Sequence, residues 1–427
     1  MITVGLDFGT HQTKICVETR SGAETHYSFV KYANREGVMK YTLPSVINIL
    51  DDGLVEYGYI SDRPGKEKRY FKQAVFRNSN SPGMTVWEAA RYSIWYLANI
   101  LFDLEDRYGQ AFNIQMGVPT DSERLGDMKA IAVTLVVSAY KLVEDVFKNK
   151  KEDFLKCKVY ELSEKTEIVR YSDEVKRKYG ILVFPEAYAC LMPMVSRGKI
   201  AHGMNLVIDI GGGTTDISFF TIEEAREKSR IYRPQVYDFY SIGKGLNYLA
   251  NNDMTSIPNY CEAVHMVQND ELLADKKTVY HKEISAICDH IAEALKSEWR
   301  LQTELKEFRL KDALKNRPVV YTGGGSTLSS LRIPYDGFAE VQMISYDNWK
   351  KNLFDDEEMF KDSKLCPVLS TAYGLSIGVT NDNIEKKPFR DIFKDRRGDK
   401  EDSQNKARSL GRDFGGFEYG DDWDAWK

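Results

Sequence analysis

The stretch NLVIDIGGGTTDISFF, Asn205–Phe220, places an aspartate directly after an apolar run and follows it with three glycines, two threonines and a second aspartate. The apolar residues on either side of the glycines predict two strands joined by a tight turn. Thr3–Glu18, TVGLDFGTHQTKICVE, repeats this plan at the start of the chain. The sequence therefore contains two hairpins of the same design, far apart along the chain.

The glycine turns of the two hairpins have the composition of an anion-binding loop. Glycine turns tightly and lets a ligand approach main-chain N–H groups without a Cβ in the way. Convergent N–H groups in such a turn form a nest for anions. A carboxylate beside a phosphate is repulsive unless a divalent cation lies between them, so we interpret Asp7 and Asp209 as Mg²⁺-binding residues. Two such hairpins, facing each other, would hold a phosphate chain from both sides.

Composition indicates a globular protein with more than one domain. The chain has 427 residues, 42% hydrophobic and 29% charged, which is enough for two hydrophobic cores. A net charge of −5 argues against nucleic acid as a main ligand, because phosphate neutralisation needs a basic surface. Six scattered cysteines have no metal-ligand spacing and fit a reducing compartment.

The sequence also gives expectations about location. The N-terminus enters a strand at once, without a basic leader, so we expect no secretory signal. No apolar run reaches the roughly 20 residues of a membrane span, and the longest, Ala130–Val143, is expected to be a buried helix. We therefore expect a cytoplasmic protein without a membrane partner.

Strand and helix patterns alternate along the chain, which predicts an α/β fold. We expect strands at Thr3–Leu6, Lys14–Glu18 and Asn113–Thr120, and a β-rich stretch at Ser45–Ile60. Ile181–Val195 reads as a strand, a turn at Pro185 and a helix, and Val319–Leu331 as a strand, a glycine turn and a helix start. We expect helices at Val86–Tyr108, Asp121–Lys148 (one or two, capped by Asp121 or Ser122), Ile284–Leu305 and Thr371–Val379.

Two charged regions differ from the rest of the chain. We interpret residues 148–178 as a surface insertion. From residue 381 onward the composition becomes polar, and Lys394–Asp413, which has no aromatic residue, predicts a disordered linker. The last residues, Asp413–Lys427, interleave aromatic with acidic side chains. They are either a disordered end or a motif that docks on a partner or on the chain itself, since aromatics supply binding energy and acids steer towards a basic groove.

Together the motifs resemble the actin-like ATPase superfamily, most nearly the nucleotide-binding domain of the DnaK-type, Hsp70-like chaperones. Leu6–Thr10 is similar to the first phosphate motif of that family and Asp209–Ser218 to the second. Thr322–Thr327 resembles the adenosine motif. The other segments that carry the resemblance are Phe184–Ala189 and Ser370–Gly378, the two connecting helices, and Thr42–Ile49 and Tyr70–Arg77, an early strand and a lysine segment. They follow the family's order from residue 1 to about 380.

The resemblance implies a two-lobed, ribonuclease H-like fold with a duplicated β-hairpin core that binds phosphate. Residues 1–200 would form the first lobe, and residues 201–380 the second, whose last helix packs back toward the first. Residues 381–427 would be a disordered linker and an acidic-aromatic tail. The implied activity is slow hydrolysis of ATP to ADP, with Mg²⁺, in the cleft between the lobes.

The family also implies roles for single residues. Asp7 and Asp209 would hold Mg²⁺, and Lys72 would contact the γ-phosphate. Glu186 and Asp216 would orient or activate the attacking water, as phosphoryl transfer requires. The implied nucleotide-contacting positions are Gly9, Thr10, His11, Gly211, Gly212, Gly213, Thr214, Thr215, Gly243, Gly324, Gly325 and Ser326.

Some positions depart from the family. Leu328 stands where the chaperones carry an arginine that stacks on adenine, and Val368 stands where an acid is expected near the second connecting helix. The residues after 380 are too few and too polar for the β-rich peptide-binding domain of those chaperones, so any output would pass through the domain's own surface or the tail.

We therefore expect a nucleotide-dependent switch or chaperone-like regulator that works with a separate, unidentified protein partner. Three alternatives remain open on the sequence. One is a filament-forming actin homologue of the plasmid-segregation or cell-shape type, which would assemble with itself. The others are a small-molecule kinase of the same fold and a pseudo-ATPase that only binds nucleotide.

Overall fold

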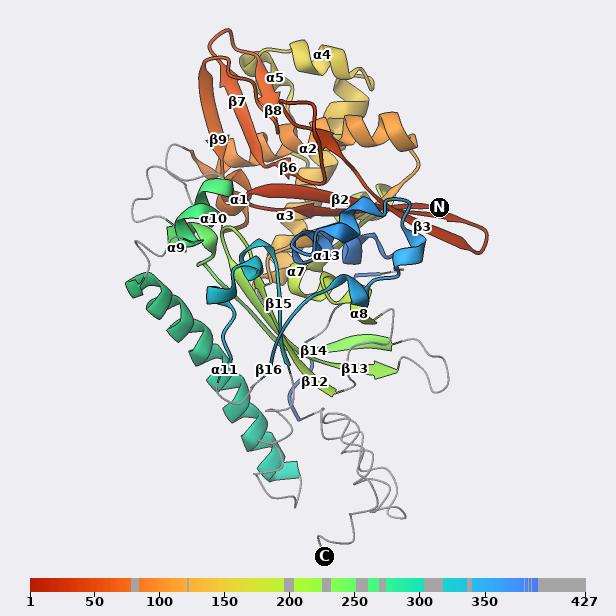
Figure 1. Ribbon diagram of the computed structural model, residues 1–427. Coiled ribbons are helices and arrows are strands. Elements are labelled where there is room, and N and C mark those ends of the chain that lie inside the picture. Colours follow the sequence, from red (N-terminus) through yellow and green to blue (C-terminus); the bar gives the residue numbers. More distant parts are fainter. Residues whose placement is uncertain are drawn as a thin grey trace, which may run out of the picture.

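The chain folds as a mixed α/β protein built on two large sheets (Figure 1). The structure is a computed structural model. It describes residues 1–77, 84–120, 123–195, 203–224, 232–250, 260–268, 274–302, 318–335, 340–379, 381–382, 384 and 386–390. The expected α/β class is therefore confirmed.

The first large sheet contains the N-terminal hairpin at its centre. Its strands, in spatial order, are β11 (Ile181–Pro185), β10 (Asn113–Val118), β1 (Ile2–Phe8), β2 (Gln12–Ser21) and β3 (Glu24–Phe29), with β6 (Leu43–Pro44) paired to β2. Strand β1 runs antiparallel to β2 and parallel to β10, and β10 runs parallel to β11. Strand β3 is antiparallel to β2.

The second large sheet repeats this arrangement. Its order is β14 (Tyr232–Ile242), β13 (Thr215–Glu224), β12 (Gly203–Ile210), β15 (Pro318–Thr322) and β16 (Glu340–Met343). Strand β12 is antiparallel to β13 and parallel to β15, β13 is antiparallel to β14, and β15 is parallel to β16. In order and direction, β12, β13, β14, β15 and β16 thus correspond to β1, β2, β3, β10 and β11. The resemblance between the two sequence hairpins extends to whole sheets.

Smaller elements surround these sheets. The remaining strands are β4 (Tyr32–Ala33), β5 (Met39–Lys40), β7 (Val46–Leu50), β8 (Val55–Tyr57) and β9 (Gly65–Arg69). The helices are α1 (Phe71–Arg77), α2 (Val86–Tyr108), α3 (Leu125–Lys141), α4 (Lys151–Lys156), α5 (Val159–Lys165), α6 (Asp173–Lys178), α7 (Glu186–Ala189), α8 (Met192–Val195), α9 (Leu246–Ala250), α10 (Tyr260–Gln268), α11 (Ala274–Gln302) and α13 (Leu365–Ser376).

The two ends of helix α2 are fixed by the residues next to them in the sequence. The Thr85 side chain accepts a hydrogen bond from the Glu88 backbone, and the Glu88 carboxylate accepts one from the Thr85 backbone, which forms a capping box. Gly109 follows the last turn with φ of 76°, a conformation that glycine adopts without strain. The helix therefore spans Val86–Tyr108, the range predicted from the sequence.

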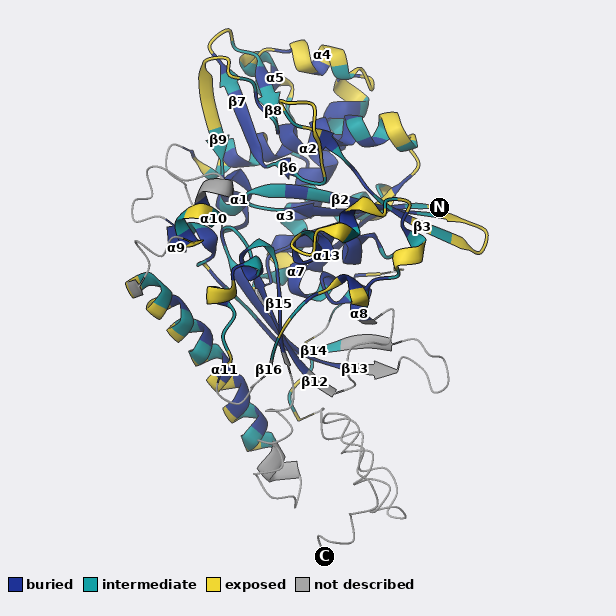
Figure 2. Ribbon diagram, viewed as in Figure 1, coloured by how far each residue is buried: buried dark blue, intermediate teal, exposed yellow. Residues whose placement is uncertain are grey.

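Each large sheet has its own hydrophobic core. Helices α2 and α3 contribute to the core of the first sheet, and α11 contributes to that of the second. On α11 the fully buried side chains Tyr280, Ile284, Cys288, Ile291 and Leu295 recur every three or four residues, as one helix face requires. Figure 2 shows the sheets and α13 mostly buried, with exposed residues on α4 and on one side of α11.

A third hydrophobic cluster joins the two sheets. It contains Cys16 of β2, Val207 of β12 and Tyr373 of α13, together with Met194 of α8 and the two residues that follow α7, Cys190 and Leu191. Packing here is close: a Cβ added at Gly374 of α13 would lie 1.7 Å from the Ala189 carbonyl oxygen of α7. A Cβ added at Gly5 of β1 would lie 2.3 Å from Ala372 O of the same helix. Helices α7, α8 and α13 therefore form the layer between the sheets.

Several predicted helix limits were wrong. The helix expected from residue 121 begins at Leu125, and Arg124 at its N-cap makes no side-chain capping bond. Asp121 and Ser122, the predicted caps, lie outside the described residues. The helix expected from Ile284 begins at Ala274, because Tyr280 extends the apolar face by one turn. The helix expected from Thr371 begins at Leu365 and ends at Ser376.

The charged segment 148–178 is folded onto the first core. It forms α4, α5 and α6, and its Phe154 and Leu162 are buried there. The Phe154 ring contacts the rings of Tyr57, Phe102 and Phe147. Its charged residues cover the surface, while a few apolar side chains anchor it.

The first residues of the predicted disordered linker contact both sheets. Asp382 is 4% exposed, and its carboxylate accepts hydrogen bonds from Lys176 Nζ and from Val183 N of β11, the latter at 2.9 Å. The backbone N–H of Lys387 donates to Val236 O of β14 at 2.9 Å. Phe389 packs on Phe219 and Tyr237. The segment after residue 381 is therefore folded against both sheets, where disorder was expected. The residues that it contacts lie far away in the sequence, so no local pattern predicts these contacts. Lys394–Asp413 and Asp413–Lys427 lie outside the described residues.

Two expectations about buried apolar residues can be checked. Ala130–Val143 lies within α3 and its continuation Leu142–Val146, and most of its side chains are buried. Cys16, Cys157, Cys190, Cys288 and Cys366 are free and buried. Among the described helices, none combines the length and apolarity needed to cross a bilayer.

We expect the substitution Gly374→Ala to lower the free energy of unfolding by about 2 kcal/mol or more. The added methyl group would collide with the α7 backbone, which cannot move aside as a flexible side chain does. Urea unfolding measures the effect. Gly126→Ala is the matched control, because nothing lies within 4 Å of the added Cβ there. Equal midpoints for both variants would contradict the close packing of α7 and α13.

Candidate functional site

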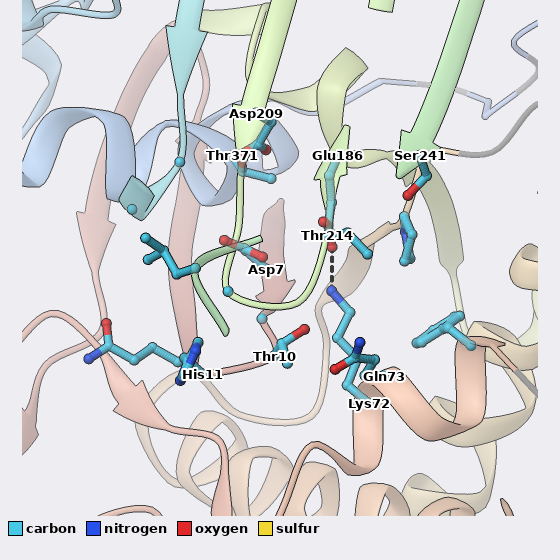
Figure 3. Close-up of a pocket in the computed structure, with 18 of the residues that line it drawn as sticks. Asp7, Thr10, His11, Lys72, Gln73, Glu186, Asp209, Thr214, Ser241 and Thr371 are labelled. Carbon is cyan, nitrogen blue, oxygen red and sulfur yellow. Dashed lines mark hydrogen bonds and ion pairs between the residues drawn. The ribbon is translucent and has the colours of Figure 1, made fainter. Parts of the chain in front are cut away.

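A cavity of about 280 Å³ lies between the two glycine turns. Gly9, Thr10 and His11 of the β1–β2 turn line it, and so do Gly212 and Thr214 of the β12–β13 turn. Figure 3 shows Thr10 and Thr214 projecting toward the same space from the two hairpins. The turns that the sequence places far apart are thus brought together at one site.

Strand ends place the acidic residues of this cavity. Asp7 near the end of β1 pairs in register with Lys14 of β2, and Asp209 near the end of β12 pairs with Asp216 of β13. The parallel neighbour β15 ends at Thr322, and Gly323 and Gly324 after it also line the cavity. The site therefore lies beyond the carboxyl ends of parallel strands, where open α/β sheets bind ligands.

Two largely buried ion pairs cross the site. Lys14 Nζ lies 2.9 Å from Asp7 Oδ2, with side-chain exposures of 15% and 7%. Lys72 Nζ lies 2.5 Å from Glu186 Oε1, with exposures of 5% and 12%, and Figure 3 marks this contact. Burial lowers the pKa of Lys14, but the adjacent Asp7 carboxylate outweighs it and raises that pKa overall. Lys72 comes from the first turn of α1, and Glu186 opens α7 directly after β11.

Neither Asp209 nor Asp216 forms such an ion pair with another described residue. Burial, together with the charges of Glu186 and Asp7, raises the pKa of Asp209 to about 7. Burial and the charge of Glu186 raise the pKa of Asp216 well above its usual value. The Asp216 Oδ1 atom is buried and has no hydrogen-bond partner among the residues that the structure describes. The site thus holds more carboxylate than its lysines neutralise, and a bound cation would relieve that excess.

The carboxylates fit a weakly chelated cation. Within the described part of the chain, no three His, Cys, Asp or Glu side chains come close enough together to chelate a metal ion. Mg²⁺ in phosphate-binding sites needs only one or two carboxylates, since water and phosphate oxygens complete its shell. Asp7 and Asp209, one from each hairpin, match that requirement.

Most residues predicted for the site line the cavity. They are Asp7, Gly9, Thr10, His11, Lys72, Glu186, Asp209, Gly212, Thr214, Gly243 and Gly324. Asp216 lies behind the wall, close enough for its charge to act on Arg77. The other predicted residues that do not line the cavity are Gly211, Gly213, Thr215, Gly325 and Ser326.

Of these residues, Thr215 points into the interior of the second sheet, and Ser326 points back into its own turn. Thr215 Oγ1 donates to Lys244 O at 2.8 Å and lies 2.9 Å from the Tyr280 hydroxyl. Ser326 Oγ donates to Gly323 O at 2.7 Å and is fully buried. Both hydroxyls are thus engaged in holding the protein's own backbone.

His11 links the first turn to the second half of the site. Its Nε2 makes a hydrogen bond with Asn247 Oδ1 of α9. Its ring lies so close to Gly212 that a Cβ added there would be 1.9 Å from His11 Cδ2. Burial lowers the pKa of His11 to about 4, so the ring is neutral near pH 7. The small size of Gly212 is what allows the two turns to meet at this ring.

The two departures from the family have different surroundings. Leu328 is 6% exposed, belongs to the core of the second sheet and does not line the cavity. Val368, near the start of α13, does line the cavity. An apolar wall therefore stands at the position where the motif resemblance leads one to expect an acid.

The sequence reasoning missed seven cavity residues with polar side chains, which are Gln12, Lys14, Gln73, Arg77, Arg124, Ser241 and Thr371. Lys14 could have been found from the repeat, because it follows Asp7 by the same number of residues as Asp216 follows Asp209. Gln73 and Arg77 lie four residues apart and therefore share a face of α1, the helix that also carries Lys72. Nothing local marks Arg124 or Ser241, which reach the cavity through packing.

The assignment of this site rests on its own residues. No protein-family model matches the chain, and no curated protein matches its sequence. The motif resemblance and the common cavity are therefore the two observations from which a function can be inferred.

We expect Lys72→Met to lower the free energy of unfolding by about 3 kcal/mol, because it leaves the Glu186 carboxylate buried without its partner. The double variant with Glu186→Gln should lose less than the sum of the single changes. A double-mutant cycle by denaturant unfolding measures this coupling. Lys156→Met is the control, since its pair with Glu152 is exposed and should matter little. Additive changes would show that Lys72 and Glu186 do not interact.

Proposed function

We propose that this protein is an actin-like ATPase, closest to the Hsp70 type, that binds Mg²⁺–ATP between two lobes and hydrolyses it slowly. One observation carries the proposal. Two glycine turns, each following an aspartate, face one cavity from two sheets of the same strand order. In the two-lobed arrangement, residues 1–200 and 201–380 would each contain one of these sheets.

The phosphate chain of the nucleotide would lie between the turns. Backbone N–H groups around Gly9 and Gly212 would bind its oxygens, and Lys14 and Lys72 would offset their charge. Bound Mg²⁺ would sit between Asp7 and Asp209 and supply further charge neutralisation. The adenosine would extend past Gly323 and Gly324, along the wall that Val368 contributes.

Hydrolysis would use the carboxylates beyond the γ-phosphate. The oxygen of a water molecule attacks the γ-phosphorus, the bond to the β–γ bridging oxygen breaks, and ADP leaves with that electron pair. The water's proton passes to a nearby carboxylate, and Glu186 and Asp216 are the candidates. Glu186 is fixed by Lys72, so it can orient the water, while Asp216 Oδ1 has an unused acceptor position.

The proposed output is a nucleotide-dependent switch acting on a partner protein. Helices α7, α8 and α13 share one hydrophobic cluster with both sheets, so a rotation of one sheet against the other would have to repack this layer. Such a packed layer favours discrete open and closed states over a continuous range. Docking of the partner through the tail Asp413–Lys427 remains a proposal drawn from its sequence.

The central test separates binding from hydrolysis. Asp209→Asn should abolish Mg²⁺-dependent ATP binding, because it removes one of the two proposed carboxylate ligands. Glu186→Gln should keep nucleotide binding and slow hydrolysis by roughly 100-fold or more, the usual range for a lost acid–base group. Calorimetry measures binding and phosphate release measures turnover. Glu152→Gln, on the exposed face of α4, is the control.

The outcomes separate the alternatives. Wild-type turnover in Glu186→Gln would remove this residue from the reaction. ATP binding without phosphate release in the wild-type protein would favour the binding-only alternative. Phosphate release without any added acceptor would count against a small-molecule kinase, and polymer that pellets with ATP would favour a filament-forming actin homologue over the switch.

A further inference from the structure

The cavity continues beyond the place assigned to the nucleotide phosphates. Figure 3 shows Ser241 on the far side of the Lys72–Glu186 pair from Asp7 and His11. Arg77 and Arg124 line the same cavity. We call the part lined by Arg77, Arg124 and Ser241 the arginine compartment. Nothing in the proposed hydrolysis uses it.

Arg77 is half-buried and makes no hydrogen bond or ion pair with any residue that the structure describes. Burial lowers its pKa, and the charge of Asp216 only partly offsets this effect. Its guanidinium group lies against Gly243, where an added Cβ would fall 2.2 Å from Arg77 Nη2. A guanidinium withdrawn from water without an acceptor is costly, so the position calls for an anion that arrives from outside.

The other walls of the compartment suit a small oxyanion. Arg124 Nη2 donates to Phe76 O at the end of α1, at 3.0 Å, which fixes the side chain beside the cavity. Ser241 of β14 pairs in register with Asp216, whose charge acts on Arg77, so one carboxylate lies behind the wall beside the two guanidinium groups. Guanidinium groups bind the oxygens of phosphate or carboxylate in a fork geometry.

We propose that the arginine compartment holds the inorganic phosphate formed by ATP hydrolysis before it leaves the protein. The inference rests on the proposed function. The compartment adjoins Lys72 and Glu186, the residues beside the γ-phosphate, so the cleaved phosphate can move into it without crossing ADP. Arg77 then delays phosphate release and sets how long the protein stays in its ADP–phosphate state.

The test compares Arg77→Gln with wild type in a single turnover of Mg²⁺–ATP. A quenched reaction measures the hydrolysis step, and a fluorescent phosphate sensor measures release. We expect hydrolysis within about threefold of wild type and release about tenfold faster, since a hydrogen bond to a charged group contributes roughly one to two factors of ten. Arg63→Gln is the control, because Arg63 is exposed and paired with Asp52. Release rates equal to this control would overturn the proposal.

A second measurement keeps the inference separate from the ATPase assignment. Titration of inorganic phosphate into the Mg²⁺–ADP complex, and into the nucleotide-free protein, should give an affinity about tenfold weaker for Arg77→Gln. If the wild type binds no ATP, the proposed function fails, but Arg77-dependent phosphate binding would still establish the anion site. Absence of phosphate binding in both forms would overturn it.

Two further experiments identify the chemical class of the anion and control for misfolding of the variant. Arg77-dependent binding of acetate without binding of phosphate would assign the compartment to the carboxylate of a second substrate and overturn product retention. Arg77→Lys keeps the charge but loses the planar fork, so it should release phosphate at an intermediate rate. If Arg77→Gln does not fold, as circular dichroism would show, the Lys variant carries the test, and wild-type release from it would contradict the proposal.

Discussion

The crowding of like charges in one buried site is the constraint on which the rest of this structure depends. Asp7, Asp209, Asp216 and Glu186 come from separate strands and a helix, yet their charges act on one another. Lys14 and Lys72 neutralise two of them. Burial of the other two costs free energy, which the surrounding fold has to outweigh. A protein accepts such a cost mainly where a ligand later makes use of it.

The fold meets this cost with rigid packing behind the site. Each hairpin is the centre of a five-strand path with its own core, and the α7, α8 and α13 layer fastens one sheet to the other. Glycines at positions 5 and 374 let backbone approach backbone in that layer, which leaves little freedom for the strand ends to separate. Residues 381–390 add contacts on β11 and β14, one strand from each sheet. The charged groups are thus held by elements that do not yield locally.

Charge also divides the cavity into regions with different roles. Around the two glycine turns, backbone N–H groups, lysines and aspartates are mixed, as expected where a phosphate chain and a cation bind together. Arg77, Arg124 and Ser241 line the same cavity, with the Asp216 carboxylate behind its wall. The ion pair therefore stands at the boundary between a place for a metal-bound phosphate chain and a place for a free anion. The proposed reaction carries its phosphate across that boundary.

The sequence by itself determined the features that depend on neighbouring residues. It gave the α/β class, the two hairpins with their glycine turns, the limits of α2, and Asp7 and Asp209 as site candidates, because strand alternation, capping and turn chemistry are local. Lys72 and Glu186 came from the resemblance to the actin-like ATPases. Tertiary structure alone decided which distant side chains complete the site. Arg124, Ser241 and Asn247 reach it, whereas Thr215 and Ser326 turn inward, and Asp382 is buried where a linker was expected. Such contacts join residues far apart in the chain, and packing, which no local pattern records, selects them.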